Sequence, residues 1–86
     1  MTRIVSAAIR VGDMIASMPA PARHGHVLRP LCELNNEICV QPEDYGFLTD
    51  AGKFVDRGEA KRIAREAGQL LPRCSPRDEL FSEDVW

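Results

Sequence analysis

Apolar and polar positions between residues 46 and 69 predict two short strands followed by a helix. The turn between the strands covers residues 49–53, where Gly52 is placed to adopt the positive φ of a bulged hairpin loop. After the second strand, apolar residues recur at the three- and four-residue spacing of one helix face, at Ala60, Ile63, Ala64, Ala67 and Leu71. Gly68 is a suitable stop for such a helix. This unit is the centre of the predicted fold.

Asp56 and Glu59 mark the start of the predicted helix. Asp56 stands at the N-cap, where a carboxylate accepts a hydrogen bond from a first-turn N–H group that has no partner within the helix. Glu59 follows three residues later and completes an Asp-x-x-Glu variant of the capping box. A helix cap therefore explains both acidic residues without any ligand.

A second hairpin is predicted near the beginning of the chain. Alternate residues from position 5 to position 11 are apolar, which is the period of a strand with one buried face. Gly12 and Asp13 form a suitable two-residue loop. With that loop, apolar residues face each other in three pairs: Val11 with Met14, Ile9 with Ala16, and Ala7 with Met18. Pro19 and Pro21 end the second strand, because proline cannot donate to a ladder.

A further helix is predicted from an apolar spacing at Val27, Leu28, Leu31 and Leu34. Pro30 requires that this helix begin near Gly25 or His26, so that the proline falls in the first turn or just beyond it. We expect the helix to end at Asn35–Asn36.

Two short apolar segments complete the predicted sheet, at Glu37–Val40 and Leu80–Ser82. The fold class predicted from all these elements is α+β, with a small antiparallel sheet of about four or five strands and two helices packed on one face. At 86 residues, the chain is expected to form one domain over residues 1–86, with a thin core that favours association into oligomers.

Charge and composition narrow the classes of partner. The net charge of −2 argues against a general binder of DNA, RNA or anionic membranes. Nine of the eleven basic residues are arginine, whose guanidinium suits paired contacts with phosphate. Tyr45 and Phe47 are candidates for stacking on a base, and carboxylates suit ribose hydroxyls. No apolar run approaches the ~20 residues that span a membrane, and no signal peptide is visible, so we expect a cytoplasmic protein.

Catalytic and metal chemistry have weak support in the sequence. The three cysteines lack C-x-x-C spacing, which favours buried, reduced thiols. His24 and His26 invite a metal site, but no third ligand has supporting spacing, and a start of the helix with solvent-facing or hydrogen-bonded histidines is the simpler interpretation. A nucleophile and base formed by Cys32 and His24 stays an alternative. Without any known catalytic motif, we expect neither an enzyme nor a cofactor.

Several segments of the chain resemble one family of small phage proteins. The central segments are GFLT at 46–49, GKFVDR at 52–57, EA at 59–60 and AGQ at 67–69, with further similarity in AIR at 8–10, RH at 23–24 and LFSEDVW at 80–86. Together they resemble the first type of phage Thoeris anti-defence protein. Proteins of that family are sponges, which sequester cyclic ADP-ribose isomers made by bacterial TIR-domain enzymes without cleaving them.

The resemblance implies a ligand site at a dimer interface, and it implies roles by position. The aromatic residue Phe47 becomes a candidate for stacking on adenine. Asp56 and Glu59 become candidates for contacts with ribose or adenine. Arg23 and Arg73 become candidates for binding the pyrophosphate. The same resemblance implies a homodimer, with a hexamer as the larger alternative, and a second class of ligand, the cyclic di- or trinucleotides.

Another function from a different class stays open at this point. Trp86 and Phe81 are large apolar residues near the end of the sequence, and they are suited to docking on a core or on another protein. The alternative is therefore a small phage or bacterial interaction module that acts on a host protein through this surface.

Overall fold

The described part of the chain forms four antiparallel strands and two α-helices. The computed structural model describes residues 2–34, 39–72, 74 and 76–86. The sheet has the order β2-β1-β3-β4, and its strands are β1 (Ile4–Val11), β2 (Met14–Pro19), β3 (Tyr45–Thr49) and β4 (Phe54–Asp56). The helices are α1 (His24–Leu34) and α2 (Arg57–Glu66), and short 3-10 turns cover Pro42–Asp44 and Ser82–Asp84. The predicted α+β class is confirmed.

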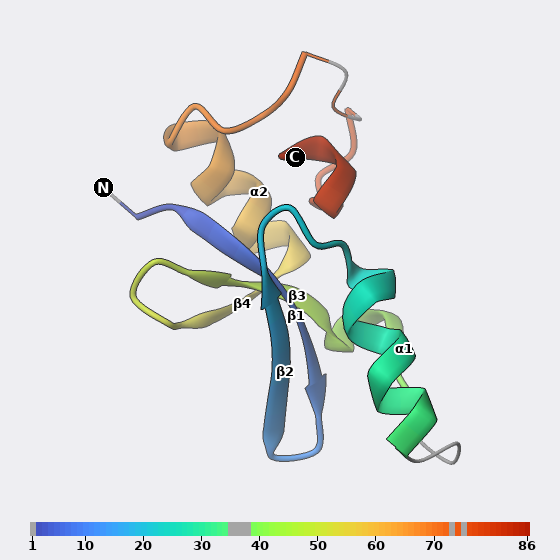
Figure 1. Ribbon diagram of the computed structural model, residues 1–86. Coiled ribbons are helices and arrows are strands. Elements are labelled where there is room, and N and C mark those ends of the chain that lie inside the picture. Colours follow the sequence, from blue (N-terminus) through green and yellow to red (C-terminus); the bar gives the residue numbers. More distant parts are fainter. Residues whose placement is uncertain (1, 35–38, 73, 75) are drawn as a thin grey trace.

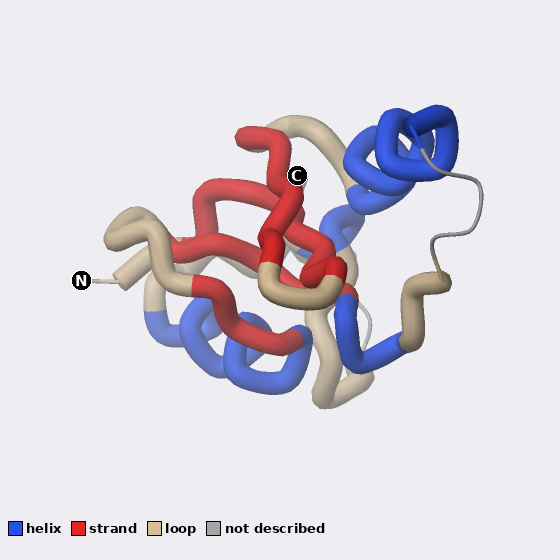
Figure 2. The backbone as a smooth tube through the Cα atoms, turned by 90° about the horizontal axis from the view of Figure 1, so that it is seen from below, coloured by secondary structure: helices blue, strands red, loops and turns tan. Residues whose placement is uncertain are grey.

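Both helices cover the same face of the sheet, over different parts of it (Figure 1). Ala7 of β1 pairs with Phe47 of β3, and Phe47 pairs with Val55 of β4, so the three side chains share one face. The half of the core under α1 consists of Ala7, Ile9, Val27 and Leu31. The half under α2 consists of Ile4, Phe47, Val55, Ala60, Ile63, Ala64 and Leu80. Figure 2 shows the two longer helices apart from one another, so the sheet and not a helix pair joins the halves.

The predicted register of the first hairpin is confirmed in all three pairs, and its loop is the expected Gly12-Asp13, with Gly12 at φ 59°. The predicted burial of its first strand is wrong at one end. A register irregularity between Ile4 and Ser6 puts Ile4 into the core at 2% exposure and leaves Val5 37% exposed. A bulge of this kind exchanges the faces of the residues before it.

The central unit also forms as predicted. A turn joins β3 to β4, with Gly52 at φ 79°, and α2 begins directly after Asp56. Gly68 follows the helix at φ 70°, the left-handed conformation expected at a helix end.

Three expectations about the remaining segments need correction. Pro30 is the seventh residue of α1, slightly further into the helix than expected, because α1 begins at His24. Leu80–Ser82 is not a strand, because Leu80 and Phe81 lead into the 3-10 turn at Ser82–Asp84. Of the strand expected at Glu37–Val40, the described residues 39 and 40 are irregular, and residues 35–38, including the expected end of α1, lie outside the described residues.

The side chain of Gln69 provides hydrogen-bond partners for the backbone at the beginning of β1. Its side-chain oxygen accepts a hydrogen bond from the N–H of Ile4 at 2.8 Å, and its amide nitrogen donates to the Ile4 carbonyl at 2.8 Å. Both bonds are partly buried, and they satisfy the backbone at the bulge, where the regular ladder is interrupted. The segment that follows α2 is thereby tied to the sheet.

We predict that Gln69→Ala lowers the free energy of unfolding by about 1–3 kcal/mol, because both backbone groups of Ile4 lose their partner. Urea denaturation followed by circular dichroism measures the change. Gln41→Ala, which truncates an exposed glutamine, is the matched control and should stay close to the wild type. Equal midpoints for the two variants would contradict the role of Gln69.

Candidate functional site

Phe47, a candidate for stacking on adenine, lies in the core. Its side chain is 0% exposed. The ring of His24 meets it edge-on at 4.8 Å between centroids, and the ring of Trp86 does so at 6.1 Å. A ligand would have to displace this packing before it could stack on Phe47.

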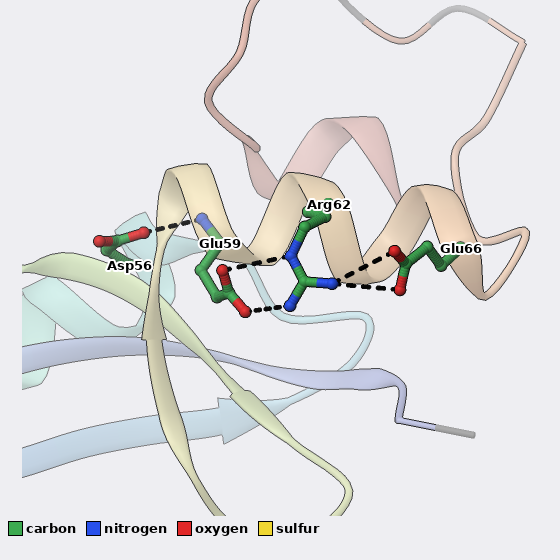
Figure 3. A network of polar contacts seen from close by, with 4 residues as sticks. All are labelled: Asp56, Glu59, Arg62 and Glu66. Atoms are coloured by element: carbon green, nitrogen blue, oxygen red, sulfur yellow. Dashed lines mark hydrogen bonds and ion pairs between the residues drawn. The ribbon is translucent and has the colours of Figure 1, made fainter.

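Asp56 and Glu59 belong to a chain of polar contacts along the exposed side of α2 (Figure 3). The N–H of Glu59 donates to Asp56 Oδ1 at 2.8 Å, so Asp56 is the predicted N-cap. The carboxylate of Glu59 binds the guanidinium of Arg62, which also donates to Glu66 at 3.2 Å. The hydrogen bond from Arg62 lowers the pKa of Glu59. Both acidic residues therefore have structural partners in the helix.

Arg23, one of the two arginines that the resemblance selected, does not join these acidic residues. Arg23 lies just before α1, where its guanidinium donates to the backbone oxygen of Trp86 at 3.0 Å and lies 3.8 Å from Glu83. It lines a hollow with Met18, Gly25, His26 and Arg29. Arg73 lies outside the described residues. Of the four expected site residues that the structure describes, Asp56 and Glu59 are in contact with each other, and Arg23 and Phe47 lie elsewhere.

A different set of side chains converges where β4 leads into α2. They surround a hollow of about 550 Å³, a volume within the usual range for small-molecule sites, and they include Arg10, Tyr45, Phe54, Asp56, Arg57 and Gly58. Glu43 and Glu79 also line it. The hollow thus combines guanidinium groups, aromatic rings, carboxylates and the first turn of a helix.

Arg57 is the most constrained charge in this hollow. Its side chain is 17% exposed, and its guanidinium lies 3.3 Å from both the Glu79 carboxylate and the carbonyl oxygen of Pro42. It also lies over the rings of Tyr45 at 5.7 Å and Phe81 at 5.2 Å. These contacts fix the guanidinium before any ligand arrives, which reduces the entropy lost on binding.

Arg10 reaches the hollow from β1 and is held less firmly. Its side chain is 46% exposed, lies 3.6 Å from Asp44 and sits over the Phe54 ring at 5.4 Å. Phe54 can lie there because Gly46 has no side chain, since a Cβ at Gly46 would come within 2.5 Å of the Phe54 ring. Sequence reasoning missed Arg10, Phe54 and Arg57. Gly46 is the residue whose position in the sequence could have indicated this packing, because a glycine inside a strand often marks the close approach of another group.

His24 and His26 each have a hydrogen-bond partner in the backbone, and His24 lies far from Cys32. His24 Nε2 lies 2.7 Å from the Gly46 carbonyl oxygen, and His26 Nδ1 accepts a hydrogen bond from the N–H of Arg23 at 2.9 Å. Cys32 is eight residues from His24 on the same helix, a rise of about 12 Å, which is too far for proton transfer. The expected burial of the thiols is wrong, because Cys32 and Cys39 are exposed and Cys74 is intermediate. Among the described residues, no three His, Cys, Asp or Glu side chains are grouped to hold a metal ion.

The comparison with known protein families decides the family. A model of the phage T4 y16D protein family matches residues 3–86, nearly the whole sequence. The chain belongs to the phage T4 y16D protein family. This confirms the expectation of a phage protein. No match was found among curated proteins or among solved structures. In the part of this family member that the structure describes, no helix is long and apolar enough to cross a membrane.

Burial lowers the pKa of His24 below its ordinary value of 6.5, and the charge of Arg57 lowers it further, against the hydrogen bond to Gly46. The unfolded chain therefore binds a proton more readily than the folded protein does. Stability is present above pH 6.5 and falls as the pH decreases from 6.5 toward the lower pKa of the folded state.

We predict that the melting temperature of this family member drops as the buffer is acidified through this interval, and that His24→Gln reduces the drop. Differential scanning calorimetry over a pH series measures it. His26→Gln controls for the loss of a histidine as such. An unchanged pH dependence in His24→Gln would contradict the assignment.

Proposed function

We propose that this phage protein is an anti-defence sponge, which binds a cyclic ADP-ribose isomer and sequesters it without cleaving it. The resemblance in sequence suggests the class of ligand, and membership in a phage protein family agrees with that origin. The hollow at the start of α2 is the proposed binding site, in place of a site built on Arg23, Phe47 and Arg73. Cyclic di- and trinucleotides are the second class of ligand to be tested.

The groups around this hollow match the parts of such a ligand. The guanidiniums of Arg10 and Arg57 suit a pyrophosphate, which they meet through charge-assisted hydrogen bonds. The rings of Tyr45 and Phe54 offer apolar surface to adenine. Asp56 caps α2 through its Oδ1 atom, and its carboxylate also suits a ribose hydroxyl. This convergence of charge and aromatic surface is the observation that carries the proposal.

The kind of groups that line the hollow supports the proposal of sequestration over turnover. A hydrolase needs an activated nucleophile or a positioned general base. Three carboxylates line the hollow, and two of them hold structural contacts: Asp56 with the first turn of α2, and Glu79 with Arg57; the third is Glu43. His24 is held by the Gly46 carbonyl on the helix side of the sheet, against Phe47. The described residues thus favour binding over bond cleavage.

The fate of the ligand is the decisive test. Protein is incubated with a cyclic ADP-ribose isomer, separated from free ligand, denatured by heat, and the released material is chromatographed. We expect intact ligand in a stoichiometric amount. Product formed in excess of the protein would overturn the sponge, and no retained ligand of either class would overturn the proposal of nucleotide binding.

We predict that Arg10→Ala weakens binding about tenfold to a hundredfold, because a hydrogen bond to a charged group contributes about 1.5–3 kcal/mol. Isothermal titration calorimetry measures the affinity, and thermal melting checks the fold. Arg65→Ala, which removes an exposed arginine near the other end of α2, is the matched control and should bind like the wild type. A loss of affinity in Arg23→Ala with none in Arg10→Ala would move the site to the start of α1.

A further inference from the structure

The outer strand of the sheet, β2, is covered poorly on both of its faces. Among the described residues, five large hydrophobic side chains are exposed, and three of them lie on this six-residue strand: Met14 at 63%, Ile15 at 43% and Met18 at 39%. The other two are Val5 and Leu34. β2 is an edge strand because the sheet order is β2-β1-β3-β4.

The usual protection of a sheet edge is missing from β2. Natural edge strands carry charges, prolines or bulges that prevent pairing with another chain. No charged residue occurs from Met14 to Ala22, nine residues in a row within a chain that is more than one-quarter charged. Pro19 is the last residue of the strand, so residues 14–18 keep every backbone donor.

The register of the hairpin identifies the backbone groups that point outward. The N–H of Ala20 donates to the Val5 carbonyl at 3.0 Å, in the same register as the pairs of β1 and β2. Bonding alternates along an antiparallel strand, so Met14, Ala16 and Met18 face β1, and Ile15, Ser17 and Pro19 direct their backbone groups away from it. The outer edge therefore offers the N–H groups of Ile15 and Ser17 and the carbonyl groups of all three.

We propose that a second copy of this chain pairs antiparallel with β2, so that two sheets join into one across a twofold axis at Ser17. In this register, Ser17 faces Ser17 of the second copy and exchanges two hydrogen bonds with it. Ile15 faces Pro19, donating its N–H to the proline carbonyl. Proline has no N–H to donate, so the outward carbonyl of Ile15 receives no backbone hydrogen bond from the second copy. The pairing makes four backbone hydrogen bonds.

Charge favours a second copy over another occupant. Each chain carries a net charge of −2, so two copies repel each other weakly as whole molecules. The uncharged segment from Met14 to Ala22 is where two copies can meet without opposing like charges. A twofold interface is also self-complementary, which an antiparallel strand pair satisfies with identical partners. This dimer is independent of the proposed ligand site, because no residue of β2 lines the hollow at α2.

The test is the mass of the protein in solution. Light scattering coupled to gel filtration is performed with a thiol reductant, because Cys32 and Cys39 are exposed and can form disulfides between chains. We expect a mass of twice 9.6 kDa or a larger even multiple at high micromolar concentration. A mass of 9.6 kDa under these conditions would overturn the proposal.

Two variants locate the interface. Ser17→Lys places like charges at the proposed twofold axis, and Ser17→Pro removes an outward N–H that β1 does not use. Both should halve the mass at least, with a far-ultraviolet circular dichroism spectrum like that of the wild type. Ala51→Lys adds the same charge at the exposed β3–β4 turn and should leave the mass unchanged. An assembly that survives in folded Ser17→Lys and Ser17→Pro would overturn pairing through β2.

Discussion

The packing of Trp86 between the two halves of the core is the contact on which the arrangement of the helices depends. Its side chain packs against the cluster under α1 and against the cluster under α2. The indole N–H donates to the Ala22 carbonyl at 2.7 Å, and the Trp86 backbone oxygen accepts from Arg23. These two hydrogen bonds hold the start of α1 against the segment that follows α2. A surface role for Trp86 in binding a host protein would compete with this packing.

Local chemistry explains which parts of the fold were predictable from the sequence. The Gly12-Asp13 loop fixes the register of the first hairpin, and Asp56 fixes the start of α2, because each signal acts within a few residues. Leu80 was wrongly predicted to lie in a strand. Its burial under α2 comes from a contact between segments that are distant in the sequence, which a local pattern does not indicate. The bulge after Ile4 is likewise held by Gln69, sixty-five residues away.

The candidate site was less predictable for the same reason. Sequence reasoning treated each arginine and aromatic residue separately, whereas Arg10, Tyr45 and Arg57 meet only through the pairing of β1, β3 and β4 and the turn into α2. Asp56 was selected correctly as an N-cap, and its position beside the hollow follows from that cap. Phe47 was selected for its ring, but the alternation of β3 turns that ring into the core.

We propose that the hollow at the start of α2 binds a phosphate-bearing cyclic nucleotide. The most direct test of this proposal is a titration of isotope-labelled protein with a cyclic ADP-ribose isomer, followed by amide chemical shifts. We expect saturable changes concentrated at Tyr45, Arg57 and Gly58, with the amides of β2 unchanged. Changes concentrated at the start of α1, or no change at saturating ligand, would contradict it.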